Sequence, residues 1–292
     1  MIKFSLLRLS LVVAGFSASA TLPARAAEAH ILALKNSPVV VGSKITTESS
    51  LFMRDGKVTL MSEGEKFTGQ NESSSTQVVT LEALSPTRFR RIETKLEEKF
   101  HMELLGEILD EPKNGGPVTG LPVILERQER EDRYTATLEK GQATEEQEEE
   151  LAKIAKEASA RDDLVIYGET PRKLGEKWNV DVTRLSSFTG VSGLTGTMSL
   201  EFVEVRNVEG VACAILKNKY DLSGTTMEEE VGKGKMTIKG EDVICRSLVD
   251  YVNLDSQGKV RTITTTESEG EPMETSGTFS VSVRSMIVKP ER

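Results

Sequence analysis

Few residue types in this chain could carry out catalysis or hold a metal. His30 and His101 are the only histidines among 292 residues. Zinc sites and nucleophile–histidine pairs need at least one positioned imidazole and usually several ligands. His101 lies in an apolar stretch that we expect to be a strand, which favours a packed or edge histidine over a catalytic base. The sequence therefore predicts no metal site and no histidine-dependent chemistry.

One short motif matches an acyl-enzyme signature. Ser256-Gln257-Gly258-Lys259 fits the pattern S-x-x-K. In the working motif the serine opens a helix, so that the lysine faces it one turn later, and S-D-N and K-T-G follow. Here we expect Asp255–Gly258 to form a turn between two strands, and neither companion motif follows. We interpret the match as chance and predict no catalytic residues, no cofactor and no enzymatic activity.

Cys213 and Cys245 are the only cysteines. A disulfide between them would close about 33 residues and contribute roughly 3.5–4 kcal/mol in the loop-entropy model. If a hairpin at 226–239 lies between their strands, the two strands are at least about 9.5 Å apart. That is beyond the ~7 Å that a disulfide spans between Cα atoms. A disulfide therefore requires adjacent or facing strands, and two buried free thiols are the alternative.

Three aromatic residues lie close together in the sequence, although aromatic residues are only 5% of the chain. Trp178, the single tryptophan, could line the mouth of an apolar cavity together with Tyr167 and Phe188. The alternative is that they simply belong to the core, where large aromatic side chains are common. We interpret the three as candidate contacts for an apolar molecule or lipid, because a bent sheet with many aliphatic side chains can leave an apolar concave face.

The N-terminus has the pattern of a cleavable secretory signal. Lys3 and Arg8 form a positive region, Leu9–Phe16 is a short apolar region, and small-x-small sites end at Ala20 and Ala26. We expect residues 1–26 to be removed. The signal contains no cysteine that could carry a lipid anchor, and no later apolar run approaches the ~18 residues of a membrane span. The sequence therefore predicts a periplasmic or secreted protein.

The charge of the chain argues against two classes of partner. The formal net charge is −9. Removal of the signal takes away Lys3, Arg8 and Arg25 and leaves 34 basic against 46 acidic residues, a formal charge of −12. Nucleic acids and anionic membranes reward basic patches, so we expect neither as a partner. The simplest use of the negative charge is solubility.

Alternating apolar and polar residues predict strands along most of the chain. The period is close to two from Lys44 onward, and Asp55-Gly56 is a strong hairpin signal. We expect Asn71–Ser75 to be an exposed loop and the Gly- and Pro-rich segment Pro112–Pro122 to be another loop. Short turns between strands mean antiparallel neighbours.

One segment, Glu145–Ser159, has the pattern of a helix. Thr144 and Gln147 have the spacing of a capping box. Acidic residues crowd the N-terminal end, where the helix dipole favours them. Leu151 and Ile154 belong to a narrow apolar stripe. We expect this acidic helix to lie across a sheet.

The combination predicts a mainly β (α+β) protein. Roughly thirteen strands are too many for a flat open sheet. We therefore expect a large bent antiparallel sheet or half-barrel with one central helix at about 144–160. The expected division is an N-terminal β half (27–140), the acidic helix (141–163) and a C-terminal β half (164–292), which can form one domain. A two-lobed β protein is the alternative.

Two segments resemble a known group of proteins. TPRKLGEKWNVDV (170–182) is followed by GTMSLEFVEVRNVEGVACAIL (196–216). They are similar to uncharacterised exported β-rich bacterial proteins, in which a G-[DE]-x-W strand opens the C-terminal domain. The resemblance implies a secreted or periplasmic β domain of unknown activity, with no catalytic residues to carry over.

Two functional hypotheses follow. The first is a non-enzymatic exported β protein that binds an apolar ligand or lipid in a concave sheet. The second is a structural or partner-binding component of the cell envelope that is recognised along its sheet edges. An apolar cavity with Trp178 at its rim would favour the first hypothesis, and a long uncovered edge strand would favour the second.

Overall fold

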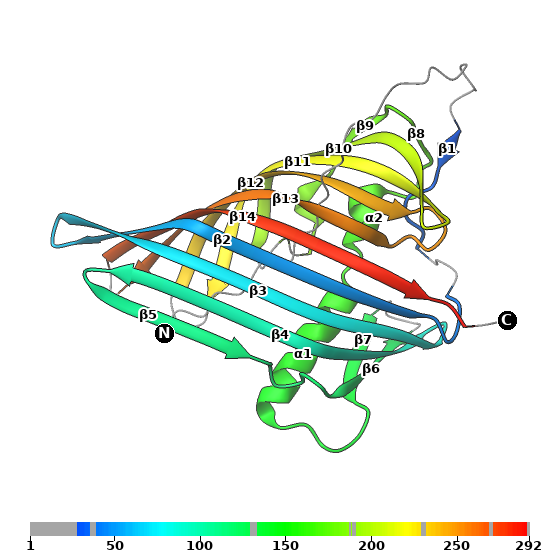
Figure 1. The fold of residues 1–292 in the computed structure, drawn as a ribbon, viewed down its shortest axis with the longest axis horizontal. Helices are drawn as coiled ribbons and strands as arrows, with labels where there is room; N and C mark the ends of the chain where they lie inside the picture. Colours follow the sequence, from blue (N-terminus) through cyan, green and yellow to red (C-terminus); the bar gives the residue numbers. More distant parts are fainter. Residues whose placement is uncertain are drawn as a thin grey trace.

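The computed structural model describes residues 28–35, 39–128, 133–186, 188, 191–228, 232–268 and 271–290. The expected signal, residues 1–26, lies outside the described residues. The chain forms one bent antiparallel sheet of 12 strands, which curves around two helices and does not close on itself (Figure 1). The expected fold class is therefore confirmed.

The strands of this sheet are mostly long, and their order is β7-β6-β4-β3-β2-β14-β13-β12-β11-β10-β9, with β5 also paired to β4. Their bounds are β2 (Lys44–Ser62), β3 (Glu65–Ser85), β4 (Arg88–Leu104), β5 (Glu107–Asn114), β6 (Pro122–Gln128), β7 (Arg133–Leu138), β9 (Lys177–Asn179), β10 (Val191–Val208), β11 (Val211–Glu228), β12 (Gly232–Ser247), β13 (Asn253–Ser268) and β14 (Glu271–Val288). Outside it are the two-stranded sheet of β1 (Ala29–His30) and β8 (Arg172–Lys173), the helices α1 (Glu145–Ser159) and α2 (Asp162–Tyr167), and a 3-10 turn (Val182–Arg184).

The last strand joins the two halves of the chain. β14 pairs with β2, with Val281 opposite Leu51 and Val288 opposite Lys44. The final segment is thus tied into the sheet as a strand, as its pattern predicts. The strands of both halves belong to one continuous sheet rather than to two separate lobes.

Helix α1 forms as expected. Thr144 accepts a hydrogen bond from the backbone N–H of Gln147 at 3.3 Å, and the Gln147 side chain accepts one from the backbone N–H of Thr144 at 3.0 Å. Its buried residues Leu151 and Ile154 pack with residues of β6 and β7 in a small hydrophobic cluster. Helix α1 therefore covers one end of the sheet, where Figure 1 shows it behind the strands.

The second helix, α2, was not expected, because the sequence pattern predicts only one helix. Asp162 and Asp163 occupy its first turn, where the helix dipole favours acidic side chains. Tyr167 at its end is buried in the main hydrophobic cluster, and Gly168 ends the helix with a φ of 69°. Six residues carry little helical periodicity, so tertiary packing decides this element. We call the face of the sheet that α1 and α2 cover the inner face.

Glycines on the inner face allow the strands to bend. The hydroxyl of Tyr220 lies across Gly240 on the neighbouring strand, where an added Cβ would lie 2.5 Å from the hydroxyl oxygen. Met53 covers Gly277 in the same way, and Asn71 covers Gly56. Glycine within a strand marks bends and close approaches, and curved sheets rely on such positions together with bulges. Side chains from the next strand then cover the exposed backbone.

Three expected turns are wrong because the strands are longer than the local signals suggest. Asp55-Gly56 lies inside β2, at a register shift between Met53 and Gly56. The hairpin turns instead at Glu63-Gly64, whose φ angles of 51° and 84° are those of a tight hairpin turn. The expected loop Asn71–Ser75 lies within β3, and the expected turn Asp255–Gly258 lies within β13. Their small polar residues are strand residues, and part of them face the inner side.

Candidate functional site

The structure brings the three predicted aromatic residues into one hydrophobic cluster on the inner face. Trp178 is 9% exposed, and its Nε1 donates a hydrogen bond to the carbonyl of Ile166 at 2.8 Å. The Arg172 guanidinium lies 4.6 Å from the centre of its ring. Phe188 packs edge-on against Tyr220, with 5.3 Å between ring centroids. Trp178 therefore ties α2 to β9, and ligand contact by these residues stays a prediction.

Tyr167 packs against a buried arginine. The Arg246 guanidinium lies 4.0 Å from the centre of the Tyr167 ring. Arg246 donates from Nε to the carbonyl of Leu32 at 2.5 Å and from Nη1 to Asn253 Oδ1 at 2.8 Å. Burial raises the pKa of Tyr167 and lowers that of Arg246. These contacts fasten α2 and the segment 28–35 to the sheet.

A polar pair lies among the apolar side chains of the inner face. Asn218 on β11 is directly opposite Asp242 on β12, and the two are 2% and 6% exposed. Asn218 Nδ2 donates to Asp242 Oδ2 at 3.1 Å. Among the described residues, Asp242 Oδ1 and Asn218 Oδ1 have no hydrogen-bond partner. Burial raises the pKa of Asp242 to about 8, and the hydrogen bond from Asn218 opposes this rise.

Two hydroxyls flank this pair. Ser256 on β13 lies opposite Ile244, two residues along β12 from Asp242, and is fully buried. The Tyr220 hydroxyl lies over Gly240, two residues from Asp242 in the other direction. Burial raises the pKa of Tyr220, and the nearby Asp242 adds to the rise. Neither hydroxyl has a hydrogen-bond partner within the described part of the chain.

A second buried carboxyl, Glu93 on β4, is well supplied with partners. Its Oε2 accepts hydrogen bonds from Gln77 Nε2 and from Arg91 Nη2, the latter at 3.4 Å. Its Oε1 accepts from Thr119 Oγ1 at 2.6 Å. Thr119 belongs to the loop between β5 and β6, and Gly120 donates its backbone N–H to the Glu93 carbonyl at 2.7 Å. Glu93 thus holds this loop against the sheet.

The two cysteines lie on adjacent strands, which corrects the expected separation. The segments 226–228 and 232–239 continue β11 and β12, so no further strand separates Cys213 from Cys245. Cys213 is opposite Ser247, and Ile215 is opposite Cys245, which makes the cysteines diagonal neighbours. Both are free and buried. Burial raises the pKa of both thiols, that of Cys245 to about 12, and the two thiols are hydrogen-bond neighbours.

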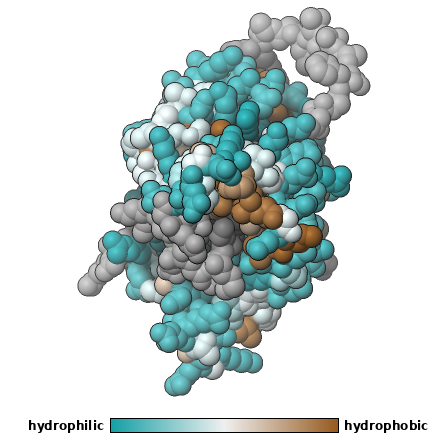
Figure 2. All heavy atoms as spheres, turned by 90° about the vertical axis from the view of Figure 1, so that its left-hand side faces the viewer, coloured by the Kyte–Doolittle hydropathy of each residue, from teal (hydrophilic) through white to brown (hydrophobic). Residues whose placement is uncertain are grey.

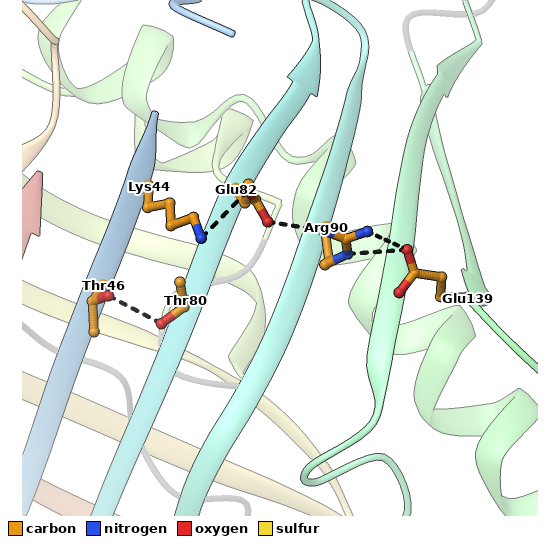
Figure 3. Close-up of polar contacts among 6 residues, drawn as sticks. All are labelled: Lys44, Thr46, Thr80, Glu82, Arg90 and Glu139. Atoms are coloured by element: carbon orange, nitrogen blue, oxygen red, sulfur yellow. Dashed lines mark hydrogen bonds and ion pairs between the residues drawn. The ribbon is translucent and has the colours of Figure 1, made fainter. Parts of the chain in front are cut away.

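The opposite, outer face carries ion pairs. Figure 3 shows a chain of contacts from Lys44 through Glu82 and Arg90 to Glu139, which links four strands or their ends. The distances are 3.4 Å from Lys44 Nζ to Glu82 Oε1, 2.9 Å from Arg90 Nη1 to Glu82 Oε2 and 2.5 Å from Arg90 Nη2 to Glu139 Oε1. Arg90 lowers the pKa of both glutamates. Such partly exposed pairs contribute little stability, so we assign them to the surface of the fold.

The histidines are structural or exposed. His101 Nδ1 lies 2.6 Å from Asp110 Oδ1 across β4 and β5, with its side chain 43% exposed. Its pKa is raised, first by the hydrogen bond with Asp110. His30 packs edge-on against Phe202 at 5.8 Å between ring centroids. Ser256 and Lys259 of the S-x-x-K match are three residues apart on one strand, so their side chains point to opposite faces.

Two open hollows of about 410 and 400 Å³ lie on the outer side of β10–β12, and neither is lined by Trp178, Tyr167 or Phe188. Figure 2 shows one end of the molecule, which is mostly hydrophilic and has its most extended gathering of hydrophobic residues near its centre. In the described ranges, no three His, Cys, Asp or Glu side chains are placed to hold a metal ion. No described helix has both the length and the apolar character needed to cross a membrane.

Comparisons with known proteins give weak likenesses. No protein-family model matches the chain, and no curated protein matches it. Among solved structures, lipovitellin, in a study of its lipid–protein interactions, aligns with a TM-score of 0.44 and 9% identity over 86% of this chain and 26% of that chain. This chain therefore spans about a quarter of the lipovitellin chain.

Two further structures align less well. An outer membrane channel from Pseudomonas putida F1 has a TM-score of 0.25 and 7% identity, over 86% of this chain and 98% of that chain. A DUF1329 family protein from Desulfovibrio piger has a TM-score of 0.11 and 10% identity, over 83% and 85%. At TM-scores below 0.5, none of these likenesses establishes a shared fold or function.

The polar pair Asn218–Asp242 is the feature that sequence reasoning missed. Neither Asn218 nor Asp242 is among the site residues that the sequence predicts. In β12 the inward positions are Ile238, Gly240, Asp242 and Ile244, so a carboxyl occupies the apolar phase of the alternation. The same holds for Asn218 between Leu216 and Tyr220. A polar residue at an inward position, where the preceding and following inward residues are apolar, was the sequence signal that could have revealed this pair.

Proposed function

We propose that this chain is a non-enzymatic exported protein that binds an apolar or amphiphilic molecule against the inner face of its bent sheet. One observation carries the proposal: polar atoms of Asn218, Asp242 and Ser256 that have no partner among the described residues lie beside the buried apolar side chains of the inner face. The large majority of buried polar atoms in native proteins have partners. Ligand sites are concave, mostly apolar and equipped with a few placed polar groups, which is the arrangement here.

Two further features support the proposal. The sheet is open, so its inner face is not sealed by strand pairing. Apolar side chains from β9 to β14 and β2 form one cluster with α2, which gives a continuous apolar lining. The separation of Ser256 and Lys259 onto opposite faces supports the expectation that the S-x-x-K match has no catalytic role.

The test uses the chain with its own N-terminus, produced in a bacterial host. Intact mass of the periplasmic fraction is expected to give a chain that begins at Ala27. Native mass spectrometry is expected to show a bound molecule that is lost on denaturation, and the stripped protein should take up a neutral hydrophobic dye. A chain that stays in the cytoplasm with residues 1–26 intact contradicts export. Absence of both a bound molecule and dye uptake contradicts the binding function.

A second candidate function, partner binding along a sheet edge, has one observation in its favour. β9 pairs only with Ser199–Glu201 of β10. Among the described residues, no strand covers 203–208 on that side, and Val203 and Val205 are 37% and 38% exposed. Such edges can accept a strand from a partner. A photo-cross-linking residue at Val205 should then give a single adduct in intact cells, and the same residue at the exposed Met286 should not. Equal adducts at both positions would argue against this function.

A further inference from the structure

We propose that Asn218, Asp242, Tyr220 and Ser256 form a recognition site for an uncharged, hydroxyl-bearing headgroup of a lipid. This inference rests on the proposed function and names the chemistry of the ligand. The site consists of four side chains on the neighbouring strands β11, β12 and β13, all facing the inner side. Each is at least nine-tenths buried, and each has a polar atom without a partner among the described residues.

The placement of the four groups brings their free atoms to one region of the sheet. Asn218 and Asp242 are a direct cross-strand pair held by one hydrogen bond of 3.1 Å. On β13 the residue opposite Asp242 is Gly258, which has no side chain. Ser256 is the next inward residue of β13 in one direction along the sheet, and the Tyr220 hydroxyl lies over Gly240 in the other direction. Ser256 and Tyr220 are each a diagonal neighbour of Asp242, and diagonal neighbours in a sheet are about 7–8 Å apart at Cα, so Asp242 lies between the two hydroxyls.

The chemistry of the free atoms selects the headgroup. Asn218 Oδ1 only accepts hydrogen bonds, whereas the two hydroxyls both donate and accept. Burial raises the pKa of Asp242 to about 8, so its carboxyl is mostly protonated at neutral pH and can also donate. A hydroxyl both donates and accepts, and a glycerol headgroup has several hydroxyls to share among these atoms. It therefore matches the site without adding a buried charge.

Charged headgroups fit less well. A carboxylate needs a cationic partner when buried. The buried cation near this region, Arg246, binds Leu32 and Asn253 and stacks on Tyr167, and its charge is already paired with the Asp163 carboxylate at 3.8 Å. An ammonium group would pair with Asp242 only after the carboxyl loses its proton, which burial opposes at neutral pH. The surrounding apolar cluster would contact the hydrocarbon chain of a lipid whatever its headgroup. Lipids with the same chain and different headgroups are therefore distinguished by the headgroup alone.

The experiment compares three ligands with an 18-carbon monounsaturated chain: monooleoylglycerol, oleate and oleylamine. Displacement of N-phenyl-1-naphthylamine is measured at pH 7 with wild-type protein, Asp242→Leu, Ser256→Ala and Tyr220→Phe. We expect wild type to bind monooleoylglycerol at least tenfold more tightly than the other two. Asp242→Leu should lose about tenfold for monooleoylglycerol with dye affinity unchanged. Asp242→Asn should retain most of the affinity, because an amide also donates and accepts.

The matched control is Asp221→Asn, which removes a carboxylate from the outer face of β11, where Asp221 pairs with Lys239 at 2.7 Å. It should leave all three affinities unchanged. If Asp242→Leu does not fold, Ser256→Ala and Tyr220→Phe test the site instead. Each should weaken the affinity for monooleoylglycerol threefold or more. Dye binding with equal affinity for the three lipids, or tighter binding of oleate or oleylamine, overturns the headgroup site and leaves the proposed function standing. Failure of wild type to bind the dye and all three lipids overturns both.

Discussion

Glu93 and Asp242 are both buried carboxyls on the inner face of one sheet, at 4% and 6% exposure. Glu93 lies in the N-terminal half, and both of its oxygens accept hydrogen bonds, from Gln77, Arg91 and Thr119. Asp242 lies in the C-terminal half and has one partner, Asn218. Its second oxygen has none within the described ranges.

The difference separates a structural carboxyl from one available to a ligand. A buried charge that is paired and fully hydrogen-bonded holds its neighbours in place, and its removal leaves them unsatisfied. Glu93 does this for the loop between β5 and β6. Asp242 lies in an apolar cluster and is mostly neutral at neutral pH because burial raises its pKa to about 8. Asp242 makes one hydrogen bond, with Asn218, and among the described residues its other oxygen has no partner and can bond a ligand.

Replacement of Glu93 gives the largest expected effect. Glu93→Leu removes the carboxylate that lies 3.4 Å from the buried guanidinium of Arg91, and loss of one partner of a buried pair costs about 3–5 kcal/mol. We expect the free energy of unfolding, measured by urea denaturation, to fall by that amount. Asp242→Leu should cost about 1 kcal/mol, since one hydrogen bond is lost. Equal losses for the two variants would remove the distinction between the carboxyls.

The cysteine pair tests how firmly the same two strands hold their diagonal neighbours apart. Cys213 and Cys245 lie on the same two strands as Asn218 and Asp242. Diagonal neighbours are about 7–8 Å apart at Cα, beyond the ~7 Å that a disulfide spans, so we expect oxidised glutathione to leave both thiols reduced. A disulfide that did form would lower the mass by about 2 Da and raise the free energy of unfolding by roughly 3.5 kcal/mol, and either change would contradict this separation.

The control is Cys213→Ala, which cannot form the bond. Oxidised glutathione should change its stability no more than it changes that of the wild-type protein. Since both thiols are buried and their pKa values are raised, Ellman's reagent should react slowly with the reduced native protein and quickly after unfolding. Formation of disulfide-linked dimers would contradict the burial of the two cysteines.

The next prediction concerns the pH dependence of stability that Asp242 should cause. Burial raises the pKa of Asp242 from 3.8 to about 8. Between these values the folded protein keeps a proton that the unfolded chain releases. The contribution of Asp242 therefore makes the protein less stable as pH rises from about 4 to about 8, by at most about 1.4 kcal/mol per pH unit. The neighbouring Tyr220 and Tyr167 stay neutral in this window because burial raises their pKa values.

Asp242→Asn should abolish this decrease in the free energy of unfolding between about pH 4 and about pH 8. Asp221→Asn on the outer face should leave the decrease unchanged. Urea unfolding at intervals of one pH unit gives the measurement. A wild-type slope that survives in Asp242→Asn would assign the effect to other groups and would remove the argument that Asp242 is neutral.

The sequence predicts the fold class well because its signals are additive along long segments. Alternation over whole strands fixes the sheet, and the Thr144–Gln147 capping box fixes the start of α1. The predicted turn at Asp55-Gly56 is wrong because the pairing of β2 with β3 continues past this local hairpin signal, with a register shift. Helix α2 was not predicted because its six residues depend on contacts with distant strands.

The candidate site was harder to predict for the same physical reason. Asn218 and Asp242 are 24 residues apart in the chain, and only the pairing register of β11 with β12 makes them neighbours. An error in that hairpin also gave the wrong separation for Cys213 and Cys245. Trp178, Tyr167 and Phe188 do come together, because aromatic side chains collect in cores whatever their register. Apolar clustering is thus easier to anticipate than the pairing of two particular polar side chains.

The smallest expected effect concerns His101, an exposed counterpart to the two buried carboxyls. Asp110 raises its pKa above 6.5, with Glu72 and Glu103 adding to the rise. The protonated form is favoured in the folded state. Its contribution is therefore fully present below about pH 6.5 and is lost as pH rises through the higher folded-state pKa. Because the pair is exposed, solvent and salt screen it.

We therefore expect a visible titration shift without a visible change in stability. NMR titration of the His101 ring should give a midpoint above 6.5, and Asp110→Asn should lower this midpoint, whereas the urea midpoints of the two proteins should coincide. Added salt should reduce the wild-type shift, because the charges face solvent. A clear loss of stability in Asp110→Asn would show that exposed ion pairs contribute measurably to the stability of this fold. The neutrality of Asp242 would then no longer be needed to explain why stability changes between pH 4 and pH 8.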